Sequence, residues 1–216
     1  MQLNRTRIKI CGITRLEDAL QAVALGVDAL GFVFVPSSPR YVSMQKAQQI
    51  LAQLPPFVQT VGLFMDTGAA NIEQVLGNIP LDLLQFHGSE DEAFCVQWHK
   101  PYIKVVAMGD AAASALLQAE QDYASAAGLL LDSHRQGQSG GSGKVFDWAM
   151  IPTGMDKPIV LAGGLNCDNV SQAVAQVKPY AVDISSGVEA DKGIKDAKLM
   201  RQFVEGVKQG DQLKRA

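Results

Sequence analysis

Short apolar runs alternate with amphipathic stretches along almost the whole chain, and this alternation is the feature that most constrains the fold. The apolar runs have the length of β-strands, and the stretches between them have the length and periodicity of helices. Strands that alternate with helices in this way predict a parallel sheet. The predicted strands are 7–11, 28–35, 57–65, 81–86, 102–107, 128–131, 158–162 and 180–185, and the predicted helices are 14–25, 43–54, 69–77, 90–98, about 111–123, 168–177 and 196–207.

The number of these units favours one architecture. We count eight strand–helix units in a chain of 216 residues. At roughly 150 residues per domain this length predicts a single domain, 1–216. Eight units favour a closed (β/α)8 barrel, the TIM barrel, in which eight parallel strands are surrounded by helices. An open, doubly wound sheet is the alternative, but nothing in that architecture requires eight strands.

Local signals mark the ends of two helices. Thr14 and Glu17 have the spacing of a capping box, so we expect Thr14 to begin the first helix. Gly26 is a typical residue for ending that helix. The last residues, 208–216, are polar, and we expect them to form a frayed helix end.

The alternation is interrupted once, by a glycine-rich stretch at about 133–145. It has little periodicity, and strands and helices resume directly after it. Long loops of this kind are usually functional or disordered. We interpret it as a functional loop within the domain, plausibly a lid, rather than as a linker between domains.

Charge and cysteine usage exclude several classes of function. Nineteen basic and 22 acidic residues give a net charge of −3, with no run of Lys and Arg, so we expect no nucleic-acid partner. The longest apolar runs are too short for a membrane span, so we expect no membrane partner. Three cysteines without a C-x-x-C pair, and three histidines without metal spacing, predict a reduced, cytoplasmic protein without a metal. No apolar stripe demands a partner chain, so we expect a monomer.

In a barrel of this type the active site lies at the C-terminal ends of the strands. Reactive or polar residues follow several predicted strands, which indicates a small-molecule site. Cys11 ends the first strand, Arg40 follows the second, His87 the fourth, and Asp132 the sixth. On the fourth strand Gln85 has the same parity as His87, so both are expected to face the mouth of the barrel.

Phosphate is often held by the loops after the seventh and eighth strands of such barrels. The first of these loops contains Gly163 and Gly164, where backbone amides can approach a ligand closely. The second contains Ser185, Ser186 and Gly187, at the possible start of a short extra helix. Two ordinary turns are the alternative, but their position favours a phosphate cradle.

Strand parity predicts a buried ion pair. Ile8 and Ile10 should pack outward, so Lys9 and Cys11 should point into the barrel. Asp183 points inward on the eighth strand, which neighbours the first strand when the barrel is closed. Because an unpaired buried charge is costly, we expect Lys9 and Asp183 to be paired, with Lys9 also favouring the Cys11 thiolate.

The chain resembles the phosphoribosylanthranilate isomerase family over nearly its whole length. The matching segments occur in order and include Lys9–Thr14, Ser38–Val42, Gln85–Gly88, Leu131–Ser133, Leu161–Leu165 and Val182–Glu189. The glycine-rich loop departs from the family pattern in one position, with Ser142 in place of the expected threonine.

The resemblance implies a step of tryptophan biosynthesis that needs no cofactor. In it, N-(5-phosphoribosyl)anthranilate is rearranged to an aminoketose by proton transfers alone, an Amadori rearrangement. The carboxylic acid and the cysteine that carry the acid and base roles map to Asp132 and Cys11. Arg40 is a candidate for binding the anthranilate carboxylate, while Gln85, His87 and Asp183 are expected to contact the phosphosugar–anthranilate substrate and Lys9 to support Cys11.

Two alternatives remain open, and the second belongs to another class of function. The first is another sugar-phosphate isomerase on a similar barrel. A histidine-pathway isomerase would be expected to show two similar halves, and no such internal repeat is present. The second is a sugar-phosphate-binding barrel without catalytic activity, against which the presence of both Cys11 and Asp132 argues. Activity on the aminoaldose would separate them.

Overall fold

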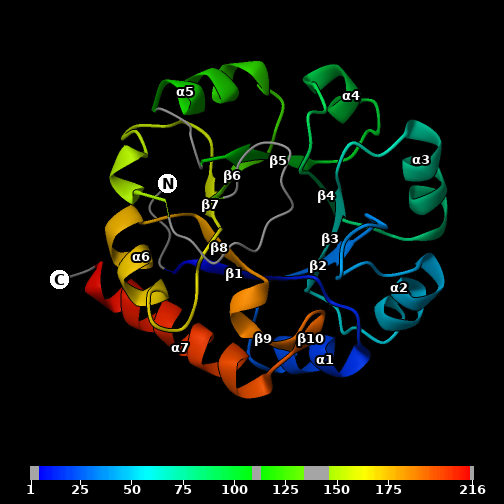
Figure 1. Cartoon of the computed structure of the whole chain (residues 1–216), viewed down its shortest axis with the longest axis horizontal. Coiled ribbons are helices and arrows are strands. Elements are labelled where there is room, and N and C mark those ends of the chain that lie inside the picture. Colours follow the sequence, from blue (N-terminus) through cyan, green and yellow to red (C-terminus); the bar gives the residue numbers. More distant parts are fainter. Residues whose placement is uncertain (1–4, 109–112, 134–145, 215–216) are drawn as a thin grey trace.

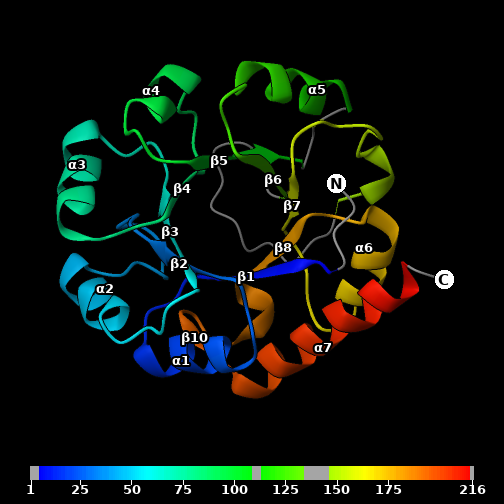
Figure 2. The ribbon, with the colours of Figure 1, turned by 180° about the vertical axis from the view of Figure 1, so that it is seen from behind.

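The computed structural model describes residues 5–108, 113–133 and 146–214. Eight parallel strands, β1 to β8, close into one barrel in chain order, and helices surround it (Figure 1). The same ring is seen from behind in Figure 2. The prediction of a closed eight-stranded barrel is confirmed. The strands are β1 (Arg7–Cys11), β2 (Ala29–Val33), β3 (Gln59–Phe64), β4 (Leu83–Phe86), β5 (Tyr102–Ala107), β6 (Gly128–Asp132), β7 (Ile159–Leu161) and β8 (Ala181–Ile184).

Seven α-helices and two 3₁₀ turns are present among the described residues. The helices are α1 (Leu16–Ala24), α2 (Met44–Leu51), α3 (Ala69–Asn78), α4 (Glu92–Val96), α5 (Ala113–Asp122), α6 (Val170–Val177) and α7 (Ala197–Leu213). The 3₁₀ turns are η1 (Trp148–Met150) and η2 (Ser186–Val188). In this part of the chain, no helix combines the length and the apolar composition that crossing a bilayer requires. Apart from Ser133, the predicted glycine-rich loop lies outside the described residues.

A small antiparallel hairpin follows β8 and was not predicted. Its strands are β9 (Glu189–Asp191) and β10 (Ile194–Lys195), and Figure 1 places it beside α1. Strands of two or three residues carry no periodic pattern, so the sequence gives no sign of them.

The parity of the strands separates two apolar layers. Ile8, Ile10, Val182 and Ile184 belong to the large core between the barrel and the helices. A second, smaller cluster fills part of the barrel interior and includes Ile103 and Ala181 from alternate positions. Lys9 pairs in register with Asp183 across the β1–β8 seam that closes the barrel. Both side chains therefore lie inside, as the parity argument predicted.

The prediction that Thr14 begins the first helix is wrong. The residue that precedes α1 is Arg15, in an extended conformation and without a side-chain capping bond. The Thr14 hydroxyl instead donates to the Gly193 carbonyl oxygen in the β9–β10 hairpin. A contact with a residue so distant in sequence outweighs the local capping preference. Gly26 ends the helix as predicted, with a φ of 82° in the left-handed region.

The polar C-terminal residues also differ from the expectation, because α7 continues without fraying to Leu213. The Asp211 carboxylate accepts hydrogen bonds from the Thr6 backbone N–H at 2.8 Å and from the Thr6 hydroxyl at 2.7 Å. Lys214 donates to the same hydroxyl at 2.6 Å. These bonds join the end of α7 to the residue before β1.

Close packing of α7 against α6 allows a test of the fold. A Cβ atom at Gly210 would lie 2.6 Å from the Ser171 carbonyl oxygen and 2.7 Å from the Val174 Cβ. Gly210→Ala should therefore lower the free energy of unfolding by about 1–3 kcal/mol, although alanine favours helix. Gly77→Ala in α3 is the matched control, since nothing lies within 4 Å there, and it should gain up to about 1 kcal/mol. Urea unfolding measures both, and equal gains would contradict this packing.

Candidate functional site

The C-terminal ends of the strands carry most of the predicted site residues. Cys11 is the last residue of β1 and Asp132 the last of β6. Gln85 lies in β4 and Asp183 in β8, both with buried side chains. The mouth of the barrel thus combines a thiol, two carboxyl groups and an amide.

Lys9 and Asp183 form a buried ion pair beside Cys11. The Lys9 ammonium lies 3.0 Å from each carboxylate oxygen of Asp183, and the two side chains are 6% and 7% exposed. The predicted pairing is confirmed. Burial alone would lower the pKa of Lys9, but Asp183 and Cys11 outweigh it and hold the pKa above its ordinary value. The lysine is therefore charged.

The ionisation of Cys11 is set by two opposing effects. Its side chain is buried, and burial raises the pKa of the thiol. The positive charges of Lys9 and Lys195 act in the opposite direction, as predicted for Lys9, but they do not overcome burial. The thiol is therefore the favoured form in the free site, and a base role requires the thiolate to be stabilised when the substrate binds.

Asp132 lies on another part of the barrel mouth, close to His87. Its carboxylate oxygen Oδ2 lies 3.8 Å from the His87 Nε2, and both side chains are largely buried. The His87 Nδ1 lies 3.4 Å from the amide nitrogen of Gln85. The Gln85 carbonyl oxygen is buried and has no hydrogen-bond partner among the described residues. The structure therefore brings these three predicted residues together, with one amide oxygen available to a ligand.

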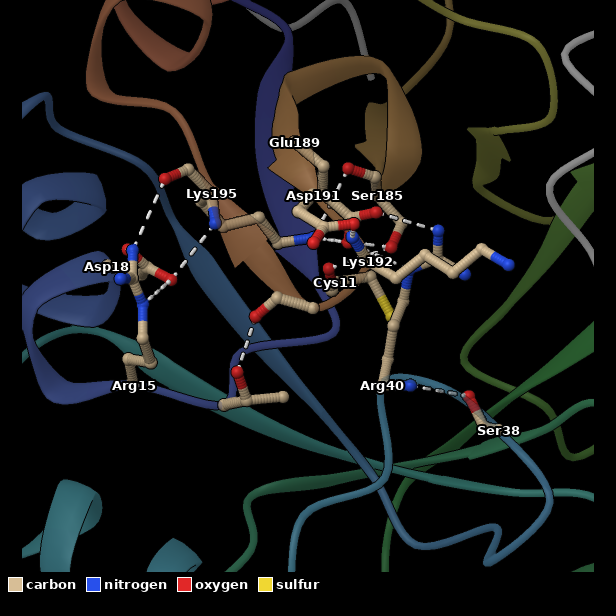
Figure 3. Close-up of polar contacts among 12 residues, drawn as sticks. Cys11, Arg15, Asp18, Ser38, Arg40, Ser185, Glu189, Asp191, Lys192 and Lys195 are labelled. Carbon is tan, nitrogen blue, oxygen red and sulfur yellow. Dashed lines mark hydrogen bonds and ion pairs between the residues drawn. The ribbon is translucent and has the colours of Figure 1, made fainter.

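Arg40 reaches the site but is already engaged by a residue that was not predicted to function there. Its Nε and Nη2 each lie 2.8 Å from one carboxylate oxygen of Glu189. The hydrogen bonds to Glu189 raise the pKa of Arg40 further. Glu189 also accepts from Lys195, whose side chain is fully buried (Figure 3). Nothing local in the sequence marks Lys195, because the hairpin that carries it was not visible there.

The two predicted phosphate loops lie against each other. Gly163 and Gly164 have φ values of 72° and 69°, in the region that favours glycine. A side chain at Gly163 would collide with Ser133 and Asp132, and one at Gly187 with the Leu165 carbonyl oxygen. The backbone N–H groups of Gly163, Gly164, Ser186 and Gly187 donate to no acceptor within the described ranges. Two adjoining loops whose backbone N–H groups have no acceptor are suited to bind an anion.

A large cavity among the described residues lies elsewhere. It measures about 690 Å³ and opens at the N-terminal ends of the strands, where Ala29, Val61, Ile103 and Val160 line it. The reactive groups lie at the opposite end, so the chemistry of the residues, not the size of the cavity, locates the site. In the described part of the chain, no group of three His, Cys, Asp or Glu side chains is placed to hold a metal ion.

Comparison with known proteins shows the family to which the chain belongs. The model of the family described as N-(5'phosphoribosyl)anthranilate (PRA) isomerase matches residues 8–206. The N-(5'-phosphoribosyl)anthranilate isomerase of Pseudomonas fluorescens Pf0-1 is 53% identical over 208 residues, which cover 95% of this chain and all of the relative.

Two solved structures have the same architecture. Phosphoribosyl anthranilate isomerase from Thermotoga maritima is 42% identical, with a TM-score of 0.85 over 94% of this chain and 98% of its own. A second isomerase structure, 38% identical with a TM-score of 0.78 and the same coverage, holds reduced 1-(o-carboxyphenylamino)-1-deoxyribulose 5-phosphate. The similarity therefore extends over sequence and fold together.

The Lys9–Asp183 pair gives a prediction about stability. Asp183→Leu leaves a buried ammonium without a counter-charge, so it should lower the free energy of unfolding by about 3–5 kcal/mol. The double variant Lys9→Met/Asp183→Leu should lose less, because an apolar pair of similar size replaces the ion pair. Urea unfolding of both variants and of Lys9→Met completes the cycle. A loss in the double variant equal to the sum of the losses in the two single variants would show that the two charges are not coupled.

Proposed function

Because the chain belongs to the N-(5'-phosphoribosyl)anthranilate isomerase family, we propose that Cys11 and Asp132 carry out the proton transfers of that reaction. The chain is an isomerase of tryptophan biosynthesis, and it converts N-(5-phosphoribosyl)anthranilate to 1-(2-carboxyphenylamino)-1-deoxyribulose 5-phosphate. The observation that carries the residue assignment is the presence of a thiol and a carboxyl group at the ends of two strands that open on one barrel mouth.

The substrate has two anionic ends, and the site offers a partner for each. The phosphate is bound by the backbone N–H groups of Gly163, Gly164, Ser186 and Gly187. Ser185, which begins the second loop, supports them. The anthranilate carboxylate is bound by the part of the Arg40 guanidinium that the bonds from Nε and Nη2 to Glu189 leave open. The bound molecule in the solved homologue carries the same two groups, which supports a site with two anion-binding parts.

The reaction begins with opening of the furanose ring. Asp132, as the general acid, donates a proton to the ring oxygen while the lone pair of the anilino nitrogen forms a C1=N bond. The ring C1–O bond breaks, and its electrons remain on the protonated oxygen as a hydroxyl. A carboxyl group buried to this extent, beside His87 at 3.8 Å, is shielded from water during the transfer.

The second step moves a proton from carbon. The Cys11 thiolate removes the C2 proton, and the C–H electrons form a C1=C2 bond while the C1=N electrons return to nitrogen. The resulting enolamine takes up a proton at C1 and loses the hydroxyl proton at C2, which gives the ketone. Lys9 stabilises the thiolate, and Gln85 and His87 contact the sugar. We also place the enzyme in the cytoplasm, since all three cysteines are free and Cys11 must stay reduced.

Substitution of the acid and the base tests the assignment. Cys11→Ala and Asp132→Asn should each reduce kcat/KM by at least about a hundredfold, because each removes a proton-transfer group. The assay follows the loss of anthranilate-type fluorescence with freshly generated substrate. Cys167→Ala and the exposed Asp168→Asn are matched controls outside the site and should keep the wild-type rate. Wild-type rates in either site variant would remove that residue from the mechanism.

A further inference from the structure

Lys195, in the hairpin that follows β8, contacts both anion-binding parts of the proposed site. Its ammonium lies 2.8 Å from a Glu189 carboxylate oxygen. It also donates to the carbonyl and hydroxyl oxygens of Ser185, at 3.2 and 3.3 Å. Figure 3 shows the side chain extending from the hairpin toward these two residues. A lysine with no exposed side-chain surface and three acceptors is held in one position.

The backbone of the hairpin is fixed to the loop after β1. The Lys195 N–H donates to the Asp18 carboxylate at 3.0 Å, and Asp18 is only 1% exposed. Arg15 binds the same carboxylate through two nitrogens, and the Thr14 hydroxyl donates to Gly193. Figure 3 shows Asp18 and Arg15 on one side of Lys195 and Glu189 and Ser185 on the other.

Ser185 continues the link to the proposed base. Its hydroxyl donates to the Cys11 carbonyl oxygen at 3.0 Å. Between these residues and Arg40 lies Gly12, where a Cβ would be 2.6 Å from the Arg40 Cδ and 3.1 Å from the Ser185 Oγ. The buried Lys195 ammonium is thus connected through Ser185 to Cys11 and to the proposed phosphate loop. Through Glu189 it is connected to Arg40.

The charges of this group do not cancel. Glu189 Oε1 accepts from both Lys195 and Arg40, each at 2.8 Å, and Oε2 accepts from Arg40 alone. Burial alone would raise the pKa of Glu189, but the bonds to Arg40 and Lys195 hold it below its ordinary value, so Glu189 is charged. Burial lowers the pKa of Lys195, and the contact with Glu189 opposes that effect. With Lys195 and Arg40 both protonated, two cations share one anion. Without Lys195 the Arg40–Glu189 pair would be neutral.

Only one of the two cations reaches the mouth of the barrel. The Arg40 side chain is 15% exposed, whereas that of Lys195 is not exposed at all. The uncompensated positive charge is therefore presented to a ligand through Arg40. A charge fixed in advance, in a site with little water, favours an anionic ligand without a cost of reorganisation.

We propose that Lys195 is a positioning residue that neutralises Glu189, so that Arg40 keeps a free positive charge for the substrate carboxylate. This rests on the proposed function, in which Arg40 binds that carboxylate. The Lys195 ammonium binds Ser185 and Glu189 rather than the side chains of Cys11 and Asp132, and its charge lowers the pKa of Cys11 less than that of Lys9 does. Its effect should therefore appear in binding, and in KM more than in kcat.

Three variants test the proposal. Lys195→Met should raise KM, and the Kd for reduced 1-(o-carboxyphenylamino)-1-deoxyribulose 5-phosphate, at least about tenfold, with kcat within about threefold of wild type. The double variant Lys195→Met/Glu189→Gln removes both opposed charges and again leaves Arg40 uncompensated. Its Kd should return to within about threefold of wild type. Lys198→Met, an exposed lysine on α7, is the matched control and should bind like wild type.

Two results would overturn the proposal. Binding by Lys195→Met that equals the control would show that the charge is not needed. A double variant as weak as Lys195→Met would mean that the lysine only supports Ser185. If Lys195→Met does not fold by circular dichroism, the double variant alone decides by the same threefold criterion. Absence of turnover in the wild type would instead contradict the proposed function, and the Kd comparison would still test the charge argument.

Discussion

The seam between β1 and β8 is the constraint on which the rest of the site depends. Closing the barrel brings the first and the last strand into register, so that Lys9 stands beside Asp183. Neither charge would be tolerated alone at this depth, because a buried ion without a partner costs several kcal/mol. The pairing of β1 with β8 that closes the barrel therefore also creates the charged pair beside Cys11.

The same seam determines where the remaining charges lie. The chain leaves β8 through Ser185 and η2 and then forms the β9–β10 hairpin, which returns to the loop after β1. This path places Glu189 and Lys195 next to Arg40, which arrives from the loop after β2. An enzyme with a small negative net charge thus places two basic side chains around one carboxylate at the mouth of its barrel, where we propose that a substrate with two anionic groups binds.

Much of this was accessible from the sequence, because strong periodic signals specify the fold. Strands such as 7–11 and 102–107 were predicted to the residue, and parity on β1 and β8 predicted the Lys9–Asp183 pair. The glycine and serine loops after β7 and β8 were located by the rule that barrels bind phosphate there. Cys11, Asp132 and most of the expected substrate contacts were located by their positions at the strand ends, and the roles proposed for them came from the resemblance to the family.

What the sequence did not reveal depends on contacts between distant residues. Thr14 was assigned to a helix cap because local spacing favours it, yet it binds Gly193. The short hairpin has no periodicity, so Lys195 was not recognised and Arg40 was not expected to have Glu189 as a partner. The net ionisation of Cys11 was also not predicted, since parity predicts the neighbouring lysine but not the extent of desolvation around the thiol.

The most direct test of this account is the pKa of Cys11 in wild type, Lys9→Met and Asp183→Asn. The pH dependence of iodoacetamide alkylation, followed at the Cys11 peptide by mass spectrometry, reports the thiolate. Lys9 lowers this pKa and Asp183 raises it. The pKa should therefore rise in Lys9→Met and fall in Asp183→Asn, where the thiolate becomes the remaining anion for the lysine. A Cys11 pKa that is the same in all three proteins would show that the buried pair does not control the proposed base.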